Sequence, residues 1–462
     1  MPETTHLDES IFPAKSETSS VAVWLTTADQ SILFQRQQQN LSFAKNNSNQ
    51  LPVLAVDSEQ KFQAMEGFGF ALTGGSAMLI GRLPDPDRQA LLRELFLPEA
   101  DGIGLSFLRI TIGASDLSER CFSYDDMPNG QTDNELAHFN INAGDIDVIP
   151  LLREILAIYP DLKIIATAWS APEWMKTNHD FVGGKLKPEC YAVYAAYLIK
   201  YLQVMRENGV YIHAITPQNE PLNFKNQPSM VMEAAEQAEF IKNHLGPALA
   251  SAELRNVELF CWDHNCDVKE YPLAVFADEG ARRYLSGSAW HLYGGDISTL
   301  GEVHQAYPDM KLYFTEQWVG SDGQFAGDFG WHVKNVLLGS IRNWSRVVLE
   351  WNLASDPFNG PHTPGGEGRC VGALTIGAEI IRNVGYYVIA HAAKFVRPGS
   401  ERIASDAQLI PNAAFLSPAG YIVLIALNDS AEARSFNIRY QGKQALANLP
   451  ANAAATYIWR AL

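Results

Sequence analysis

Cysteine is scarce in this chain, with five residues in 462, an odd number that shows no repeated spacing. A disulfide scaffold uses paired cysteines at close spacings, so this pattern argues against one. Cys261 and Cys266 flank His264, but this spacing matches no standard zinc motif. We therefore expect buried, unpaired cysteines and no metal site.

Long apolar runs are also missing. The longest, Tyr421 to Leu427, is far too short to span a bilayer, so we expect no transmembrane segment. Residues 1–12 lack a basic stretch followed by an apolar one, so no signal peptide is visible. The location stays open between the cytoplasm and a secreted or periplasmic protein whose signal has been removed.

Basic clusters are absent as well. The chain has 52 acidic and 35 basic residues, a formal net charge of −17, and no run of Lys and Arg that could neutralise phosphates. A nucleic-acid partner is therefore not expected. No P-loop, dinucleotide fingerprint or HExxH motif occurs, so we expect neither an organic cofactor nor a catalytic metal. The oligomeric state is not indicated by any pattern.

Strand and helix patterns alternate between about residues 62 and 385, which is typical of a parallel α/β arrangement. Eight strand patterns occur with helical stretches between them, which favours a closed (β/α)8 TIM barrel over an open sheet. The expected helices include 147–159, 189–208, 230–244 and 331–343. The expected strands are 64–70, 105–111, 162–168, 212–217, 257–262, 287–291, 311–315 and 347–352.

The pattern changes from about residue 387 to short strands separated by turns, which predicts an appended antiparallel β-sandwich. Residues 21–27 also read as a strand and could join it, since chain ends often lie close together. The predicted domains are a segment 1–61 that adds strands to the sandwich, a catalytic barrel 62–385 and a sandwich 386–462. The expected sandwich strands are 394–396, 403–404, 413–416, 421–428, 434–439 and 455–460.

Two glutamates follow strands of the predicted barrel. Glu220 comes after the fourth strand, in Thr-Pro-Gln-Asn-Glu-Pro, and Glu316 ends the seventh. Active sites of such barrels lie at the carboxyl ends of the strands. Retaining glycosidases need two carboxyl groups about 5–5.5 Å apart. One such Glu is more often a surface charge, but the pair favours catalysis, and Pro221 predicts extended geometry for Glu220.

Tryptophan also gathers at the strand ends. Sugar rings present apolar C–H faces on which an indole can stack, while polar groups bind the hydroxyls. Each Trp taken alone is more often a core residue than a sugar platform. Four strand ends with Trp together favour a carbohydrate site; the residues are Trp169, Trp290, Trp318 and Trp351.

The ordered motifs resemble glycoside hydrolase family 30, in particular its glucosylceramidase-like members, over nearly the whole chain. The matching segments are Glu-Gly-Phe-Gly at 66–69, Phe-Leu-Arg-Ile at 107–110, Ala-Ser-Asp-Leu-Ser at 114–118, Ala-Trp-Ser-Ala-Pro-Glu-Trp-Met-Lys-Thr-Asn at 168–178, Pro-Gln-Asn-Glu-Pro at 217–221, His-Leu-Tyr at 291–293, Thr-Glu at 315–316, Trp-Asn-Leu at 351–353 and Lys-Phe-Val-Arg-Pro-Gly at 394–399.

The resemblance implies a role for each matching residue. It makes Glu220 the acid/base and Glu316 the nucleophile, and it places Asn219 at the 2-hydroxyl of the sugar. Arg109 matches an arginine that keeps the nucleophile ionised, although a purely structural ion pair is the alternative. Tyr293 matches a tyrosine that orients the nucleophile. The resemblance also implies three pocket-lining residues, namely Trp169, His291 and Trp351.

One segment departs from the family pattern. Glucosylceramidase-like sequences usually carry an acidic residue after the Gly-Phe-Gly strand, whereas this chain has Gly74 in Leu-Thr-Gly-Gly-Ser. A different sugar, an open subsite for a longer chain, or replacement by another loop could explain the change. The Gly/Pro-rich segment 360–366 could shape that subsite or be an ordinary loop.

The sequence thus predicts a retaining β-glycoside hydrolase, β-glucosidase-like or glucosylceramidase-like, that works by double displacement on a β-linked glycoside or glucan. An endo-β-1,6-glucanase, or another β-glycosidase of the same family, is the alternative. A non-catalytic carbohydrate-binding protein on the same fold is a third hypothesis, which the two intact glutamates disfavour.

Overall fold

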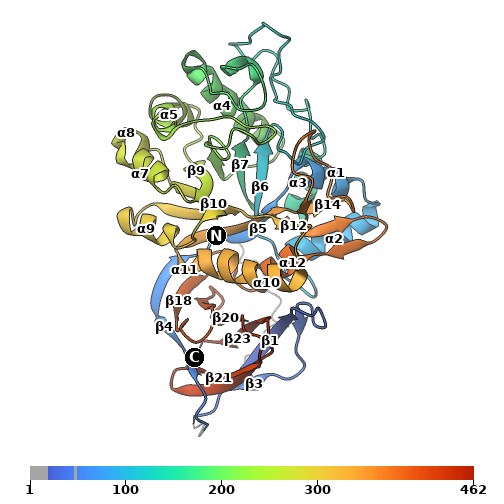
Figure 1. The fold of residues 1–462 in the computed structure, drawn as a ribbon, viewed down its shortest axis with the longest axis vertical. Coiled ribbons are helices and arrows are strands. Elements are labelled where there is room, and N and C mark those ends of the chain that lie inside the picture. Colours follow the sequence, from blue (N-terminus) through green and yellow to red (C-terminus); the bar gives the residue numbers. More distant parts are fainter. Residues whose placement is uncertain (1–18, 46–48, 462) are drawn as a thin grey trace.

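The computed structural model describes residues 19–45 and 49–461. It has two parts that are stacked along its long axis, a barrel with surrounding helices and a sheet structure at the other end (Figure 1). No helix among the described residues is long and apolar enough to cross a membrane. Residues 1–12, where the sequence shows no signal peptide, lie outside the described part.

Eight parallel strands form a closed barrel in the order β10-β11-β13-β5-β6-β7-β8-β9. All eight strands predicted from the sequence are confirmed, and so is the fold class. The strands are β5 (Gly67–Ala71), β6 (Phe107–Ile112), β7 (Lys163–Ala168), β8 (Ala214–Thr216), β9 (Glu258–Cys266), β10 (Gly287–Gly295), β11 (Lys311–Glu316) and β13 (Ser345–Asn352).

Both faces of these strands are buried, the inner face against the barrel core and the outer face against helices. An inner layer is formed by side chains from most of the strands, among them Phe107, Phe260 and Tyr313. Gly69 permits a close approach of β5 to β6, because a Cβ there would lie 1.8 Å from the carbonyl oxygen of Phe107. Burial on both faces explains why the strands read as apolar runs.

The predicted helices are present with shifted ends. The first two are α3 (Val148–Ile158) and α4 (Tyr191–Glu207). The third begins at Ala234, where Glu233 and Glu236 form a capping box, and it continues from α5 (Ala234–Phe240) into a π-helical segment (Ile241–Leu245). The fourth is a π-helical segment (His332–Gly339) followed by α11 (Ser340–Arg342).

The second part is a ten-stranded sheet that encloses its own apolar core. As predicted, the N-terminal strand joins it, since β1 (Ser20–Thr27) pairs antiparallel with β23 (Ala453–Arg460). β4 (Val53–Ala64) belongs to this sheet as well. The other strands are β2 (Gln35–Arg36), β3 (Leu41–Ser42), β18 (Glu401–Ser405), β19 (Asn412–Leu416), β20 (Tyr421–Asn428), β21 (Arg434–Tyr440) and β22 (Lys443–Leu449).

The strand predicted at 394–396 is wrong. These residues form the turn that follows α12 (Val384–Ala393), a helix that is buried along its whole length and lies between the barrel and the sandwich (Figure 1). Phe395 and Val396 are apolar and fully buried, which gives this turn the composition of a short strand. His391 of α12 lies within hydrogen-bonding distance of Thr26 in β1 and Thr456 in β23, at 2.9 and 2.8 Å, and so ties the two parts together.

α12 crosses residue 386, the predicted start of the sandwich domain. The domain limits at 61/62 and 385/386 therefore stay predictions.

Candidate active site

Glu220 and Glu316 meet at the carboxyl end of the barrel. Glu316 is the last residue of β11, and Glu220 follows β8 by four residues. An oxygen of Glu220 and an oxygen of Glu316 lie within 4.8 Å of each other and of a His291 ring nitrogen. Only 7% of Glu220 and 6% of Glu316 is exposed. The site is therefore a close, buried carboxylate pair.

The backbone of Glu220 differs from the prediction. It has φ of +44°, in the left-handed region, rather than the extended geometry that Pro221 favours. Two hydrogen bonds hold this conformation: the Glu220 N–H donates to the carbonyl of Asp263 at 3.0 Å, and the N–H of Asn223 donates to the carbonyl of Glu220 at 2.8 Å. Such a conformation costs about 1–3 kcal/mol and persists only where the surrounding contacts hold it in place.

Arg109 lies fully buried beneath the pair. Its guanidinium forms an ion pair with Glu316, donates to Asn219 Oδ1 at 2.6 Å and pairs with Asp263 at 2.9 Å. The guanidinium also lies over the rings of Trp169 and Trp351, 4.8 and 5.5 Å from their centroids. Arg109 therefore faces the predicted nucleophile and several other predicted site residues at once.

Asp263 is a site residue that the sequence reasoning missed. Its carboxylate is fully buried and accepts hydrogen bonds from Thr315, Thr216 and Thr167 at 2.6, 2.7 and 3.1 Å, besides its contact with Arg109. Burial alone would raise its pKa, but Arg109 and then His291 hold the pKa well below its ordinary value. Asp263 is thus a fixed anion that orients the cationic groups of the site.

His291 connects the buried Asp263 to the acid/base candidate. Its Nε2 lies 3.2 Å from Asp263 Oδ1, its Nδ1 lies 3.3 Å from Glu220 Oε1, and Nδ1 is 3.7 Å from Glu316 Oε1. Burial lowers the pKa of His291, but the three carboxylates raise it to about 9. The three carboxylates therefore favour the protonated form of His291.

Glu220 is the hydrogen-bonding partner of His291. Its Oε2 accepts a hydrogen bond from the Asn223 side chain at 2.7 Å, and its Oε1 faces His291. Burial raises the pKa of Glu220, but His291 and the nearby His264 imidazole outweigh it and lower the pKa to about 2. Glu220 and His291 form a coupled pair that shares one proton.

The pKa of Glu316 is shifted in the opposite direction to that of Glu220. Burial raises its pKa above the ordinary value, together with the negative charges of Glu220 and Asp263, while His291 and Arg109 oppose the rise. The hydroxyl of Tyr293 donates to Glu316 Oε1 at 2.9 Å. Both oxygens of Glu316 thus have hydrogen-bonding partners that fix the carboxylate.

The predicted aromatic residues lie together. Trp169 and Trp351 stack with ring centroids 5.3 Å apart, and with Cys370 and Leu117 they belong to a small cluster at the pocket. Trp351 and Tyr293 line the cavity of about 280 Å³ that holds the two glutamates. Of the four predicted strand-end tryptophans, Trp318 and Trp351 line this cavity. Trp169 and Trp290 are buried and do not line it, and neither does His291, which was also predicted to line the pocket.

Asp116 is a second residue missed by the sequence reasoning. It lines the same cavity, and burial and then the charge of Glu316 raise its pKa to about 8. Its position is set by the segment after β13, because the N–H of Thr363 donates to the Asp116 carbonyl at 2.8 Å. The only signal was its place in the Ala-Ser-Asp-Leu-Ser motif after β6.

The missing acidic residue at Gly74 has a structural explanation. A Cβ on Gly74 would lie 2.0 Å from Cγ of Asp145, so the Asp145 carboxyl group fills that place from another segment. Asp145 accepts a hydrogen bond from Ser118 at 2.8 Å, and burial raises its pKa to about 7. Asp145 does not line the cavity of the two glutamates, whereas Asp116 does.

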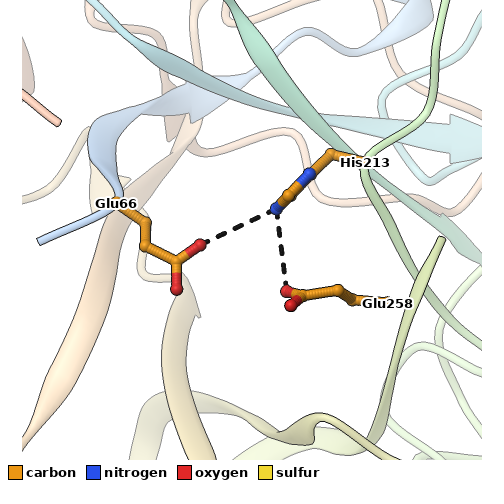
Figure 2. Close-up of side chains that lie close together, drawn as sticks. All are labelled: Glu66, His213 and Glu258. Atoms are coloured by element: carbon orange, nitrogen blue, oxygen red, sulfur yellow. Dashed lines mark ion pairs between the residues drawn. The ribbon is translucent and has the colours of Figure 1, made fainter. Parts of the chain in front are cut away.

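A second group of two glutamates and a histidine lies at the opposite, amino-terminal end of the strands. Figure 2 shows Glu66, His213 and Glu258 converging, with His213 Nε2 at 3.7 and 3.6 Å from the two carboxylates. Lys163 lies 3.0 Å from Glu66, and Lys311 lies 2.9 Å from Glu66 and 2.5 Å from Glu258. A metal ion here would meet two ammonium groups, so the cluster fits an ion-pair network better.

A larger cavity, of about 720 Å³, lies where the sandwich meets the barrel. Two of its charged groups are paired with each other: Arg382 Nε donates to Glu94 at 2.6 Å, and the Tyr386 hydroxyl donates to the same carboxylate at 2.7 Å. The cavity that holds the paired glutamates is smaller, but Asp116 and Glu367 add two further carboxyl groups to its lining. We therefore place the chemistry there.

The barrel with paired glutamates at two strand ends defines the architecture of a glycoside hydrolase, and comparison with known proteins supports the assignment. Residues 65–396 match the glycosyl hydrolase family 30 TIM-barrel domain, and residues 399–457 match the family 30 β-sandwich domain. The chain therefore belongs to glycoside hydrolase family 30, as the motifs indicated.

Three relatives show the range within this family. The endo-1,6-β-D-glucanase of Neurospora crassa is 35% identical over 352 residues, which cover 73% of this chain and 71% of the relative. The lysosomal acid glucosylceramidase of Mus musculus is 29% identical over 440 residues, covering 88% and 83%. The solved endo-β1,6-glucanase BT3312 superposes with a TM-score of 0.89 at 33% identity, covering 96% of this chain and 100% of that one.

Proposed function

We propose that this glycoside hydrolase is a retaining endo-β-1,6-glucanase, with Glu316 as the nucleophile and Glu220 as the acid/base. The observation that carries the retaining mechanism is the distance of less than 4.8 Å between oxygens of the two glutamates. An inverting enzyme would need roughly 6.5–9.5 Å between its carboxyl groups to admit a water. The β-1,6-glucanases among its relatives support the substrate.

In the first step, a Glu316 oxygen attacks the anomeric carbon and the glycosidic C–O bond breaks. The leaving oxygen takes a proton from Glu220. When a sugar displaces water from the pocket, desolvation favours the neutral pair, so the shared proton moves from His291 Nδ1 to Glu220 Oε1, 3.3 Å away. Arg109 keeps Glu316 ionised for the attack.

In the second step, the Glu220 carboxylate takes a proton from water, and the water oxygen attacks the anomeric carbon. The ester bond to Glu316 breaks, and the sugar leaves with its original anomeric configuration. Arg109 donates to Asn219 Oδ1 and so fixes the orientation of the amide, whose Nδ2 group has no partner among the described residues. It can therefore bind the 2-hydroxyl, while Asp116 offers a carboxyl group to other hydroxyls of the same sugar.

A glucosylceramidase-like activity is the second candidate, which the mouse relative supports at lower identity. The test is to incubate the protein with β-1,6-glucan, β-1,3-glucan, aryl β-glucosides and glucosylceramide. Short oligosaccharides from β-1,6-glucan are expected early in the reaction. Release of glucose from glucosylceramide, without cleavage of the glucan, would overturn the proposed substrate and favour the second candidate.

A further inference from the structure

The wall of the pocket beside Glu220 is built from two loops. Asn223 and Asn226 come from the loop after β8, and His264 and Asn265 come from the end of β9; all four line the cavity. Glu220 must protonate the oxygen that leaves. The residues gathered on its side of the pocket therefore face the leaving group more closely than the sugar that is attacked by Glu316.

The amide groups of this wall have fixed orientations. Asn226 Oδ1 accepts a hydrogen bond from the N–H of Gln227 at 2.9 Å, and Asn265 Oδ1 accepts one from the N–H of Tyr293 at 3.0 Å. Each side chain uses its oxygen in this way, so its NH2 group is the free end. Neither NH2 group has a hydrogen-bonding partner within residues 19–45 and 49–461.

His264 adds an unsatisfied group to the same wall. Only 9% of the residue is exposed, and its Nδ1 is buried without a hydrogen-bonding partner among the described residues. Its Nε2 lies 3.9 Å from Glu220 Oε1, so the ring is directly beside the acid/base. A buried polar atom that lacks a partner is costly unless a ligand supplies one.

Building on the proposed function, we propose that Asn226, His264 and Asn265 form a subsite for a leaving group that is itself a sugar. Two free amide NH2 groups and an imidazole match the hydroxyls of a sugar ring. They do not match the apolar chains of a lipid, which would need an apolar surface. Phe224 is the large exposed apolar residue of the loop, and it does not line the cavity.

The test compares two substrates that share one glycone. In 4-nitrophenyl β-gentiobioside the leaving group has no hydroxyls of a sugar, whereas in gentiotriose it is glucose. Asn226→Ala and Asn265→Ala should each lower kcat/KM for gentiotriose by about 3- to 10-fold, the loss of one hydrogen bond, and the double variant by about 30-fold. Asn226→Ala should change the nitrophenyl reaction by less than about 2-fold. Asn265→Ala also frees the backbone of Tyr293, so it should lower both reactions, and that of gentiotriose more strongly.

Asn243→Ala is the matched control, because Asn243 is an exposed asparagine whose side chain donates, among the described residues, to Glu239 alone, at 2.6 Å. It should leave both reactions unchanged. His264→Gln tests whether the imidazole contributes to binding of the leaving sugar. The melting temperature of this variant shows whether it is folded. If it is not, the two asparagine variants still decide the question.

A second measurement tests whether the subsite binds a sugar as the acceptor of glycosyl transfer. With the nitrophenyl substrate as donor, added gentiobiose should be glycosylated by the natural protein and poorly by the double variant. Equal losses on both substrates, or no loss on gentiotriose, would overturn the subsite while leaving the proposed function intact. If the natural protein cleaves neither substrate, the proposed function itself fails.

Discussion

The two ends of the barrel each hold two glutamates and a histidine, but their charge balance differs. At the amino-terminal end, Glu66 and Glu258 are matched by Lys163 and Lys311. The carboxyl end has four buried carboxyl groups but only the guanidinium of Arg109 and the imidazoles of His264 and His291 as cationic groups among the described site residues; the carboxyl groups are those of Glu220, Glu316, Asp263 and Asp116.

The pKa values follow this difference. At the lysine-matched end, burial raises the pKa of Glu66, but His213, Lys163 and Lys311 bring it well below its ordinary value. At the other end the carboxyl groups divide. Burial and like charges raise the pKa values of Glu316 and Asp116, whereas Arg109 and His291 lower the pKa of Asp263, and His291 and His264 lower that of Glu220. A cluster whose charges are balanced serves the stability of the fold. Excess buried negative charge at the carboxyl end of the strands indicates a functional site that binds substrate and takes up protons.

The largest expected effect is the loss of the nucleophile. Glu316→Gln should lower kcat/KM on β-1,6-glucan by about 10⁴-fold or more, because no covalent intermediate can form. The variant should remain folded, since the change removes a carboxyl group whose pKa burial raises. Circular dichroism and a thermal melt check the fold. Activity above about one hundredth of the natural level would assign the nucleophile elsewhere.

Next in size is the loss of the acid/base. Glu220→Gln should lower kcat/KM by about 10²–10⁴-fold on glucan. A nitrophenyl leaving group needs no proton, so the first step should be affected much less with that substrate, and azide should restore its turnover. Equal losses with both leaving groups, and no rescue by azide, would contradict the role of Glu220.

Arg109 should affect the pH profile. Glu316 must be ionised to attack, so activity falls as the pH drops through its pKa. Arg109→Met removes an opposing positive charge, raises that pKa further and should move the acidic limb of kcat/KM to higher pH, with a loss of about 10- to 100-fold at the optimum. An unmoved acidic limb would show that the arginine has only a structural role.

At the opposite end, the expected effect is on stability alone. Glu66→Gln should lower the free energy of unfolding by about 1–3 kcal/mol and leave kcat unchanged. The pKa of Glu66 in the folded protein lies below its ordinary value of 4.5. The ionised carboxylate therefore stabilises the fold fully above pH 4.5, and this stabilisation is lost as the pH falls from there through the folded pKa. In urea unfolding, the free energies of the natural protein and the variant should differ less at pH 3.5 than at pH 7.

The matched control for this variant is Glu401→Gln, in the exposed pair with Lys61 at 2.6 Å, which should cost less than about 1 kcal/mol.

The smallest expected effect concerns metals. Zinc or a chelator should leave the melting temperature unchanged, because Lys163 and Lys311 already neutralise the Glu66–His213–Glu258 cluster. A zinc-dependent rise in melting temperature that Glu66→Gln abolishes would reverse this interpretation.

The barrel could be predicted because buried parallel strands leave apolar runs, and Glu220 and Glu316 could be found because strand ends converge. Asp263 was missed although it directly follows the predicted strand 257–262, because none of the segments that match the family covers it. It faces the site because Trp262 and Asp263 adopt φ of +73° and +65° in a strand with an irregular register. The conformation of Glu220 was equally hidden, because contacts with Asp263 and Asn223 override the local preference set by Pro221.

The most direct test of the account is the anomeric configuration of the first product. Proton NMR during cleavage of a β-1,6-gluco-oligosaccharide follows the new reducing end before it mutarotates. Glu220 and Glu316 at this separation predict that the β-anomer appears first and the α-anomer only later. Initial release of the α-anomer would contradict double displacement and the assignment of both glutamates.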